Sequence, residues 1–345
     1  MCVTLTSQRH NTNDHHTNRN WLFMILKEYK LNYKGDLPFQ AVLSKVSNLI
    51  PHRHEKELEL VYCLEGTVHL EAAEQKQTLH AGQLHSIDFG DIHCLWSEDD
   101  NTTLIFHLDL TRMPNWEYFK NIFFSCEDNH LYPYQKAAMA SVKDIILSLS
   151  HEYFTGNLDD SERFNRPLTE LVDLLLKYFN WFNYENQDEH MNVDLFERFY
   201  RVLSYCINNY EKKITVSQLA AQENINRNYF SQFIGKSIFS SFSNMVNYIR
   251  CWHAEELLLT TDMPNAEISY ACGFSDPKYF YAAFKDLWGC TPSEHRQQYE
   301  EYYQECLRDP VNRKNETTLE DSAAAMILKD FMIRWHLDKT FESVQ

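Results

Sequence analysis

Two eight-residue stretches decide the fold of the last third of the chain: LAAQENIN at residues 219–226 and ISYACGFS at residues 268–275. They match at an offset of 49 residues. In each, a small second residue allows close approach of another helix, and Asn224 or Gly273 supplies a turn residue that tolerates positive φ. This order of small, turn and apolar residues predicts a helix-turn-helix unit, present twice.

The residues after each turn indicate where the next helix begins. Asn226 and Ser275 are suitable N-caps, because their short side chains accept a hydrogen bond from a first-turn N–H. A long helix over residues 243–260 is expected to link the two units. One unit is typical of any helical hairpin, whereas two linked units favour DNA binding, with their second helices about one DNA turn, roughly 34 Å, apart.

Residues 268–296 hold the most specific run of the chain. It contains Gly273-Phe274-Ser275-Asp276-Pro277, Tyr279-Phe280, Phe284-Lys285, Gly289, Thr291-Pro292-Ser293 and Arg296. This run resembles the signature of AraC/XylS-type transcription regulators, and the resemblance extends over residues 193–297. The first unit departs from that family, with Ile234-Gly235 in place of Phe-Lys and Phe239 in place of glycine. A glycine inside the recognition helix would cost about 1 kcal/mol relative to alanine.

The resemblance implies roles for residues of both units. Asn and Gln can pair with adenine, and Lys can donate to guanine. The base-reading positions fall on Asn228, Ser231, Gln232, Lys278, Tyr281 and Ala282. The side chains expected on phosphates are Arg227, Lys236, Arg250, Lys285 and Arg296. For the arginines the alternative is salt bridging to Glu255, Glu256 or Glu294.

The charge of the chain argues against tight DNA binding by one copy. The net charge is −17, and residues 211–300 hold eight Lys and Arg against ten Asp and Glu. Long-range attraction to DNA should therefore be modest. We expect a homodimer that uses both units on double-stranded promoter DNA.

The N-terminal part has a different periodicity. Residues 40–110 alternate like short strands, and Gly66, Gly82 and Gly90 fall between the runs, where turns are needed. Many short strands with regular turns are typical of a small β-barrel or sandwich.

This part also carries the motif His52-x-His54-x4-Glu59-x6-Gly66, followed by Gly82-x5-Asp88-x-Gly90-x2-His93. The spacing resembles the two cupin motifs, except that Asp88 stands where proline is usual. The resemblance implies a pocket inside the barrel lined by His52, His54, Glu59 and His93. The set suits a divalent metal such as Zn, Ni, Fe or Mn; alternatively, these side chains hydrogen-bond an effector without metal, and Glu59 could lie on a strand surface.

Two amphipathic helices are expected after the barrel. One has apolar residues from Val142 to Leu149, and the other from Leu168 to Phe182, after Pro167 as a first-turn proline. Spacing alone favours plain core for these stripes, and the family resemblance adds a dimer seam as an alternative.

These features predict an α+β, multidomain chain. A cupin-like β-barrel with a helical dimerisation segment precedes an all-α DNA-binding domain with two helix-turn-helix units. The predicted segments are a disordered tail (1–20), the barrel (21–134), dimerisation helices (135–184), a linker (185–192), the DNA-binding domain (193–300) and a helical extension (301–345). Within the extension, Leu319–Leu337 is expected to pack on the DNA-binding domain, with oligomer contacts as the alternative.

The predicted function is a DNA-binding transcription regulator that responds to a small-molecule effector, such as a sugar, in the barrel. The alternatives are a metal-dependent cupin enzyme, either a dioxygenase or an isomerase, and a DNA-silent protein that acts through protein contacts. The enzyme alternative leaves the helix-turn-helix repeat unexplained. Nine cysteines without a C-x-x-C pair, no secretion signal and no long apolar run favour a cytoplasmic protein that does not contact the membrane.

Overall fold

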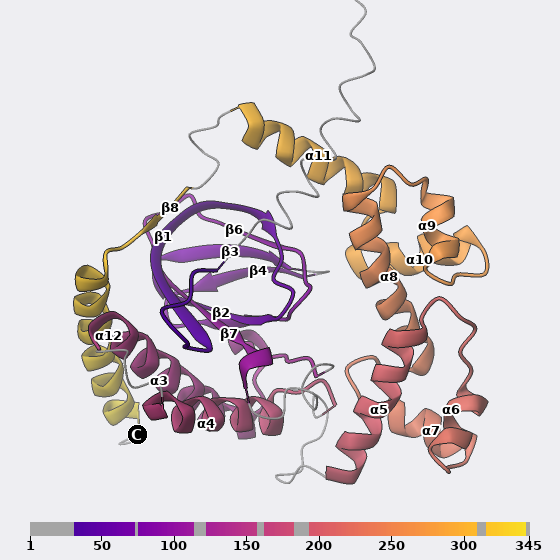
Figure 1. Cartoon of the computed structure of the whole chain (residues 1–345), viewed down its shortest axis with the longest axis horizontal. Helices are drawn as coiled ribbons and strands as arrows, with labels where there is room; N and C mark the ends of the chain where they lie inside the picture. Colours follow the sequence, from indigo (N-terminus) through magenta and orange to yellow (C-terminus); the bar gives the residue numbers. More distant parts are fainter. Residues whose placement is uncertain are drawn as a thin grey trace, which may run out of the picture.

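The computed structural model describes residues 31–72, 75–113, 122–156, 162–182, 193–308 and 315–342. The predicted tail and linker lie outside these residues. No helix among them is long and apolar enough to cross a membrane. A β-barrel and its covering helices form one half of the molecule, and a helical domain lies beside them (Figure 1).

The barrel is an antiparallel sheet in the order β4-β3-β6-β1-β7-β2-β5, with β8 also paired to β1. Its strands are β1 (Phe39–His52), β2 (Glu57–Glu65), β3 (Thr67–Ala72), β4 (Gln75–His80), β5 (Leu84–Ile87), β6 (His93–Trp96), β7 (Thr102–Asp109) and β8 (Asn315–Thr318). Alternation gives the sheet two buried faces. On β2, Val61 and Cys63 belong to one apolar cluster, and Leu60 and Tyr62 to the cluster that includes the helices.

Two helices, α3 (Pro133–Thr155) and α4 (Glu162–Tyr178), cover the outer face of the barrel (Figure 1). The predicted stripes are core of this one chain: Val142 and Leu171 are fully buried. These stripes therefore provide no dimer seam. Pro167 lies inside α4 and not in its first turn, because the helix extends toward the N-terminus and buries Phe164 as well.

The C-terminal segment contradicts the predicted purely helical extension that packs on the DNA-binding domain. It forms β8 and α12 (Asp321–Glu342), and both lie against the barrel half. Phe331 of α12 packs edge-on against Tyr62 at 5.8 Å, and Trp335 Nε1 donates to Asp144 Oδ1 of α3 at 2.7 Å. The apolar side of α12 completes the cover of the barrel, which explains why the chain returns there.

The helical domain consists of α5 (Val193–Asn209), α6 (Val216–Gln222), α7 (Arg227–Ile234), α8 (Phe242–Thr260), α9 (Asn265–Ala271), α10 (Pro277–Trp288) and α11 (Pro292–Arg308). The two predicted turns are present, with Asn224 at φ 55° and Gly273 at φ 80°. A Cβ on Gly273 would also lie 2.4 Å from the Tyr210 carbonyl oxygen, so only glycine fits there.

The cap of α7 follows the prediction, and the cap of α10 does not. Asn226 accepts a hydrogen bond from Tyr229 N, but in the second unit Asp276, not Ser275, caps the helix by accepting from Lys278 N. Pro277 occupies the first turn of α10, where its missing N–H costs nothing, and this places the cap one residue later than predicted.

Candidate functional sites

The predicted pocket residues converge inside the barrel because strand register brings them together. His52 on β1 lies opposite His93 on β6, and Glu59 on β2 lies opposite His107 on β7. Ligand atoms of His52, His54, Glu59 and His93 all lie within 4.8 Å of one another, and the four side chains are buried. Glu59 is 1% exposed, so it is not a strand-surface carboxylate.

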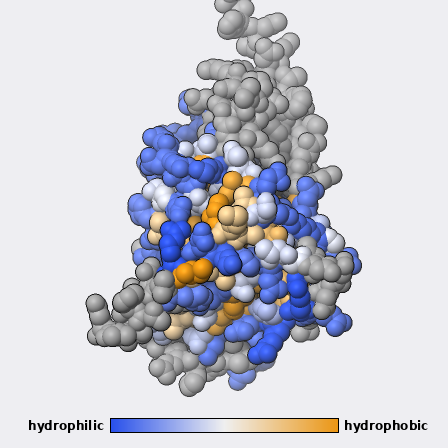
Figure 2. Space-filling model, turned by 90° about the vertical axis from the view of Figure 1, so that its left-hand side faces the viewer, coloured by the Kyte–Doolittle hydropathy of each residue, from blue (hydrophilic) through white to orange (hydrophobic). Residues whose placement is uncertain are grey.

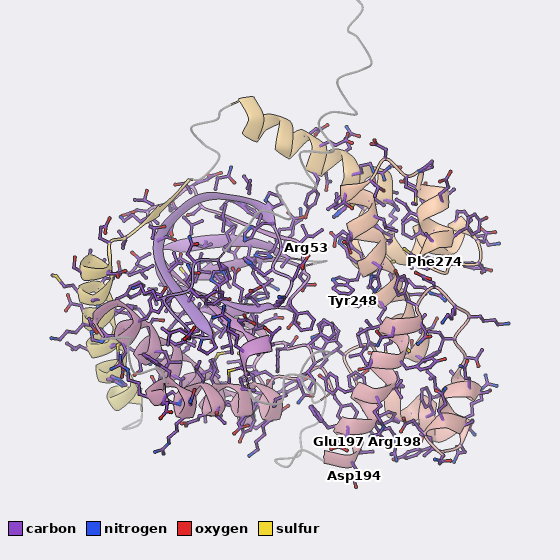
Figure 3. The ribbon with its side chains drawn as sticks, viewed as in Figure 1. Arg53, Asp194, Glu197, Arg198, Tyr248 and Phe274 are labelled. Atoms are coloured by element: carbon purple, nitrogen blue, oxygen red, sulfur yellow. The ribbon has the colours of Figure 1, made fainter. Side chains whose placement is uncertain are left out.

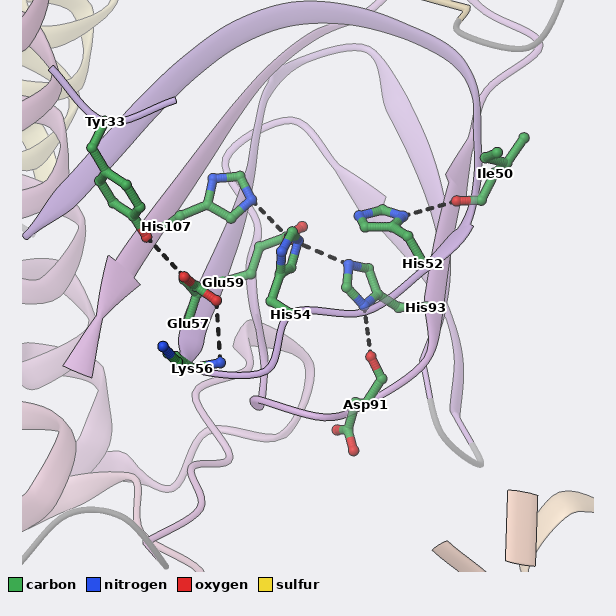
Figure 4. Close-up of polar contacts among 10 residues, drawn as sticks. All are labelled: Tyr33, Ile50, His52, His54, Lys56, Glu57, Glu59, Asp91, His93 and His107. Carbon is green, nitrogen blue, oxygen red and sulfur yellow. Dashed lines mark hydrogen bonds and ion pairs between the residues drawn. The ribbon is translucent and has the colours of Figure 1, made fainter. Parts of the chain in front are cut away.

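Glu59 is the centre of the cluster (Figure 4). Its Oε2 lies 3.0 Å from His54 Nε2, 3.2 Å from His93 Nε2 and 3.1 Å from His107 Nε2. Its other oxygen, Oε1, is buried and has no hydrogen-bond partner. The carboxylate therefore has coordinating capacity that the protein does not use.

Sequence reasoning missed His107, although the signal was present. His107 alternates with Phe106 and Leu108 and therefore shares the inner face with Ile105. It is buried, and its Nδ1 has no hydrogen-bond partner.

Backbone contacts orient two of the rings. His52 Nδ1 lies 2.8 Å from the Ile50 carbonyl oxygen, and His93 Nδ1 lies 2.9 Å from that of Asp91. Donation from Nδ1 directs Nε2 into the cluster, which is the arrangement that orients histidine ligands in metal sites.

The electrostatics suit a ligand set. Burial lowers the pKa of His52 well below its usual range and that of His54 to about 4. Burial by itself would raise the pKa of Glu59, but His93 and His107 hold it well below its usual range. Burial would lower the pKa of His93, and Glu59 raises it overall. Neutral His52 and His54 beside an ionised Glu59 match the protonation that metal ligands need, whereas His93, whose pKa is raised by Glu59, must lose its proton when a metal binds.

Asp88, the departure from the cupin pattern, has a structural role. Both of its carboxyl oxygens lie 3.1 Å from Phe124 N, which donates to them. Burial raises its pKa well above the usual range, and the nearby Asp91 adds to this effect.

The six predicted base-reading residues are exposed on α7 and α10. Figure 1 shows α7 next to α6 in one half of the helical domain and α10 next to α8 and α9 in the other half. Tyr281 also receives a hydrogen bond from Asn265 Nδ2 at 3.3 Å, so its hydroxyl is partly engaged. Among the predicted phosphate contacts, Arg227, Lys236 and Lys285 are exposed.

Arg250 and Arg296 hydrogen-bond to backbone carbonyl oxygens, a role that neither sequence-based interpretation, phosphate contact or salt bridging, included. Arg250 donates to the carbonyl oxygens of Tyr210 and Lys212, each at 3.0 Å. Arg296 donates to those of Leu258 and Met263, at 2.9 and 3.0 Å. Both guanidinium groups brace the helical domain from within.

Two domain families match the chain: a helix-turn-helix domain at residues 219–298 and a cupin domain at residues 45–109. An uncharacterized HTH-type transcriptional regulator of Escherichia coli, YdiP, is 27% identical over 74% of this chain and 83% of its own length. The lactose operon transcription activator of Staphylococcus xylosus is 34% identical over 26% of this chain and 32% of its own length.

Among solved structures, the C-terminal domain of AraT, a response regulator from Geobacillus stearothermophilus, is 29% identical. The match covers 29% of this chain and 84% of that one, with a TM-score of 0.28. The helix-turn-helix and cupin matches coincide with the two sites described above. The chain therefore joins a cupin domain to a helix-turn-helix domain, and the YdiP relative, which it matches over most of its length, is named a transcriptional regulator.

Proposed function

We propose that this regulator senses a small molecule or metal ion inside its barrel and binds promoter DNA with α7 and α10. The observation that supports this most is a division of surfaces. The histidine cluster is buried within the barrel, whereas all six candidate base-reading side chains are exposed on the helical domain. Sensing and DNA reading would thus occupy separate parts of one chain.

Each recognition helix offers its own base contacts. Asn228 and Gln232 on α7 suit adenine, and Lys278 on α10 suits guanine. Arg227, Lys236 and Lys285 would contact phosphates. Ser231, Tyr281 and Ala282 complete the candidate reading surface.

Selection from a random-sequence DNA library tests this assignment. Lys278→Ala should weaken binding to the selected DNA by about 1–3 kcal/mol and relax one base preference. Lys329→Ala, an exposed lysine of α12, is the matched control and should leave both unchanged. An unaltered selection profile for Lys278→Ala would rule out the base contact.

For the barrel, we propose that His52, His54, Glu59 and His93 hold a divalent metal. Three imidazoles and a carboxylate suit Zn, Ni, Fe or Mn. Glu59 Oε1, which is buried without a hydrogen-bond partner, is the oxygen that would coordinate the ion. A bound metal would supply an open coordination position for a polar effector. The name of the Staphylococcus relative makes sugars the first effector class to test.

Metal analysis of protein purified without a His-tag tests the site. We expect stoichiometric metal in the wild type and loss of it in His54→Ala. His69→Ala is the control, because His69 lies outside the cluster and bonds Thr78 at 3.0 Å. A metal-free wild type would reject the metal assignment and leave direct effector binding by these side chains.

We infer a regulatory role without catalysis, because the YdiP relative is named a transcriptional regulator. We also propose a cytoplasmic location, where the protein would read its promoter DNA.

Self-association is a further part of the proposal, and we assign it to α12 instead of α3 and α4. Met326 and Ile333 of α12 are 69% and 52% exposed, and Figure 2 shows apolar side chains gathered on this face. Met326→Glu together with Ile333→Glu should convert a dimer to a monomer in light scattering, and a monomeric wild type would reject it.

A further inference from the structure

The helix that links the two helix-turn-helix units lies directly against the loops that carry the barrel histidines. Arg53, between His52 and His54 in the chain, places its Nη2 2.9 Å from Glu256 Oε1 of α8. The Arg53 side chain is only 14% exposed. Figure 3 shows Arg53 on the side of the barrel that faces α8. The Glu256 side chain is 41% exposed, so solvent screens this ion pair and the contact can open.

A second contact reaches the loop of His93. Trp252 Nε1 of α8 donates to Asp91 Oδ1 at 3.0 Å, while the backbone oxygen of the same Asp91 lies 2.9 Å from His93 Nδ1. Asp91 therefore contacts α8 with its side chain and a site histidine with its backbone. We name the pairs Arg53–Glu256 and Asp91–Trp252 the clasp.

The two histidine loops are also tied to each other beneath the clasp. Gly90 N donates to the His54 carbonyl oxygen at 2.7 Å. A Cβ on Gly90 would lie 2.7 Å from Trp252 Cζ2, so the indole packs directly on this backbone. A displacement of either loop must therefore change the contact between the Trp252 indole and the Gly90 backbone.

The clasp is not densely packed. A cavity of about 300 Å³ lies there, lined in part by Arg53, Gly90, Trp252 and Glu256. The charged and titratable groups that also face it are Glu55, His253 and Glu255. Polar contacts beside open space can separate locally, while Met245, Val246 and Ile249 at the start of α8 stay in the apolar core that is shared with the barrel half.

We propose that occupancy of the histidine site controls how firmly α8 is held against the barrel, through the clasp. This rests on the proposed sensing function of that site. A ligand that binds His52, His54 and His93 together orders both loops. When α8 then docks on these loops, less conformational entropy is lost, so docking becomes more favourable. Because α8 links the first unit (α6 and α7) to the second (α9 and α10), its docking sets the freedom of the two recognition helices together.

The test uses the full-length protein, Zn²⁺ as the probe and a matched pair of tryptophans. Trp252→Phe keeps an aromatic ring but removes the donor to Asp91. Trp288→Phe is the control, because Trp288 Nε1 makes an equivalent bond to Glu255 at 3.0 Å within the second unit. Glu256→Gln, combined with Trp252→Phe, removes both parts of the clasp.

In the wild type and in Trp288→Phe, saturating Zn²⁺ should slow amide exchange over residues 246–260. In the double variant this protection should disappear. Coupling is reciprocal, so the double variant should also bind Zn²⁺ at least about fivefold more weakly, although neither residue is in the histidine cluster. Equal Zn²⁺ affinity and equal protection in all three proteins would overturn the clasp.

Failure of the proposed metal site would look different, because no variant would bind Zn²⁺. The clasp is then judged by amide exchange over residues 88–93 without metal. Faster exchange in Trp252→Phe than in Trp288→Phe supports the link from α8 to the site loop. Equal exchange in the two variants overturns it.

Discussion

The two helix-turn-helix units share a sequence pattern but are held in different ways. The second unit has a core of its own, in which Phe274, Phe280 and Phe284 pack against α8. The first unit shares the core of the barrel half. The rings of Phe182 and Phe233 are tilted, with their centroids 5.4 Å apart. The rings of Trp181 and Phe239 pack edge-on, also with centroids 5.4 Å apart.

This difference explains the departures of the first unit from the family pattern. Ile234 and Phe239, which stand where the family has Phe and Gly, are buried in the core that the first unit shares with the barrel half. Gly235 lies just after α7 as its C-cap, so the expected helix penalty does not apply. The first unit therefore contacts the barrel half, while its candidate base-reading residues stay exposed.

The largest expected effect comes from removing the segment that follows the second unit. A chain ending at Arg308 lacks β8 and α12 and exposes the surface beneath Leu328 and Phe331. These two side chains alone contribute roughly 3–6 kcal/mol by burial. Urea unfolding should show a destabilised sensor half, with DNA binding by the second unit retained.

The matched control for this truncation is Lys329→Ala with Asp330→Ala, which changes only exposed residues of α12 outside the proposed dimer contact and should shift stability by less than about 0.5 kcal/mol. If the truncated chain were as stable as the full one, α12 would not be part of the sensor core.

A pair of core substitutions tests the comparison itself. Phe239→Ala and Phe280→Ala should each cost about 3–5 kcal/mol, because each empties a buried aromatic site. Only Phe239→Ala should also speed amide exchange in the sensor half, at residues 122–126 and 179–182. Equal acceleration there in both variants would mean that the two units are held alike.

The bracing arginines give an intermediate effect. Arg250→Gln should lower stability by about 1–3 kcal/mol, because it leaves backbone carbonyls without donors. It should leave the salt dependence of DNA binding unchanged. Lys285→Gln should do the reverse and reduce the salt slope by about 1. A reduced slope for Arg250→Gln would return Arg250 to the phosphate contacts.

Asp88 should give the smallest effect, and one that depends on pH. Phe124, whose N–H it accepts, adjoins Phe123, which stacks on Trp181 at 4.5 Å at the contact with the first unit. The folded-state pKa of Asp88 is raised, so its contribution to stability is present at acidic pH and declines as pH rises toward that pKa. Asp88→Asn removes this dependence. Its melting temperature relative to the wild type should therefore increase from pH 4 to pH 7, and a constant difference would contradict the raised pKa.

Much of the candidate site could be predicted because its signals are local. The resemblance to the two cupin motifs implied four of the five clustered side chains, because each motif is a short run of residues that can be read directly from the sequence. His107 required strand pairing, because only the register of β2 with β7 brings it to Glu59.

The sequence by itself determined the two turns and the linking helix, because each depends on residues close together in the chain, and it supplied the two motifs whose histidines the β1–β6 register brings together. Only the tertiary structure decided that the α3 and α4 stripes are core, that Arg250 and Arg296 are braces, and that α12 returns to the barrel. Those outcomes depend on which surfaces are still uncovered once the other elements have packed. The same is true of the clasp, whose partners Arg53 and Glu256 are about 200 residues apart in the chain and are joined only by the fold.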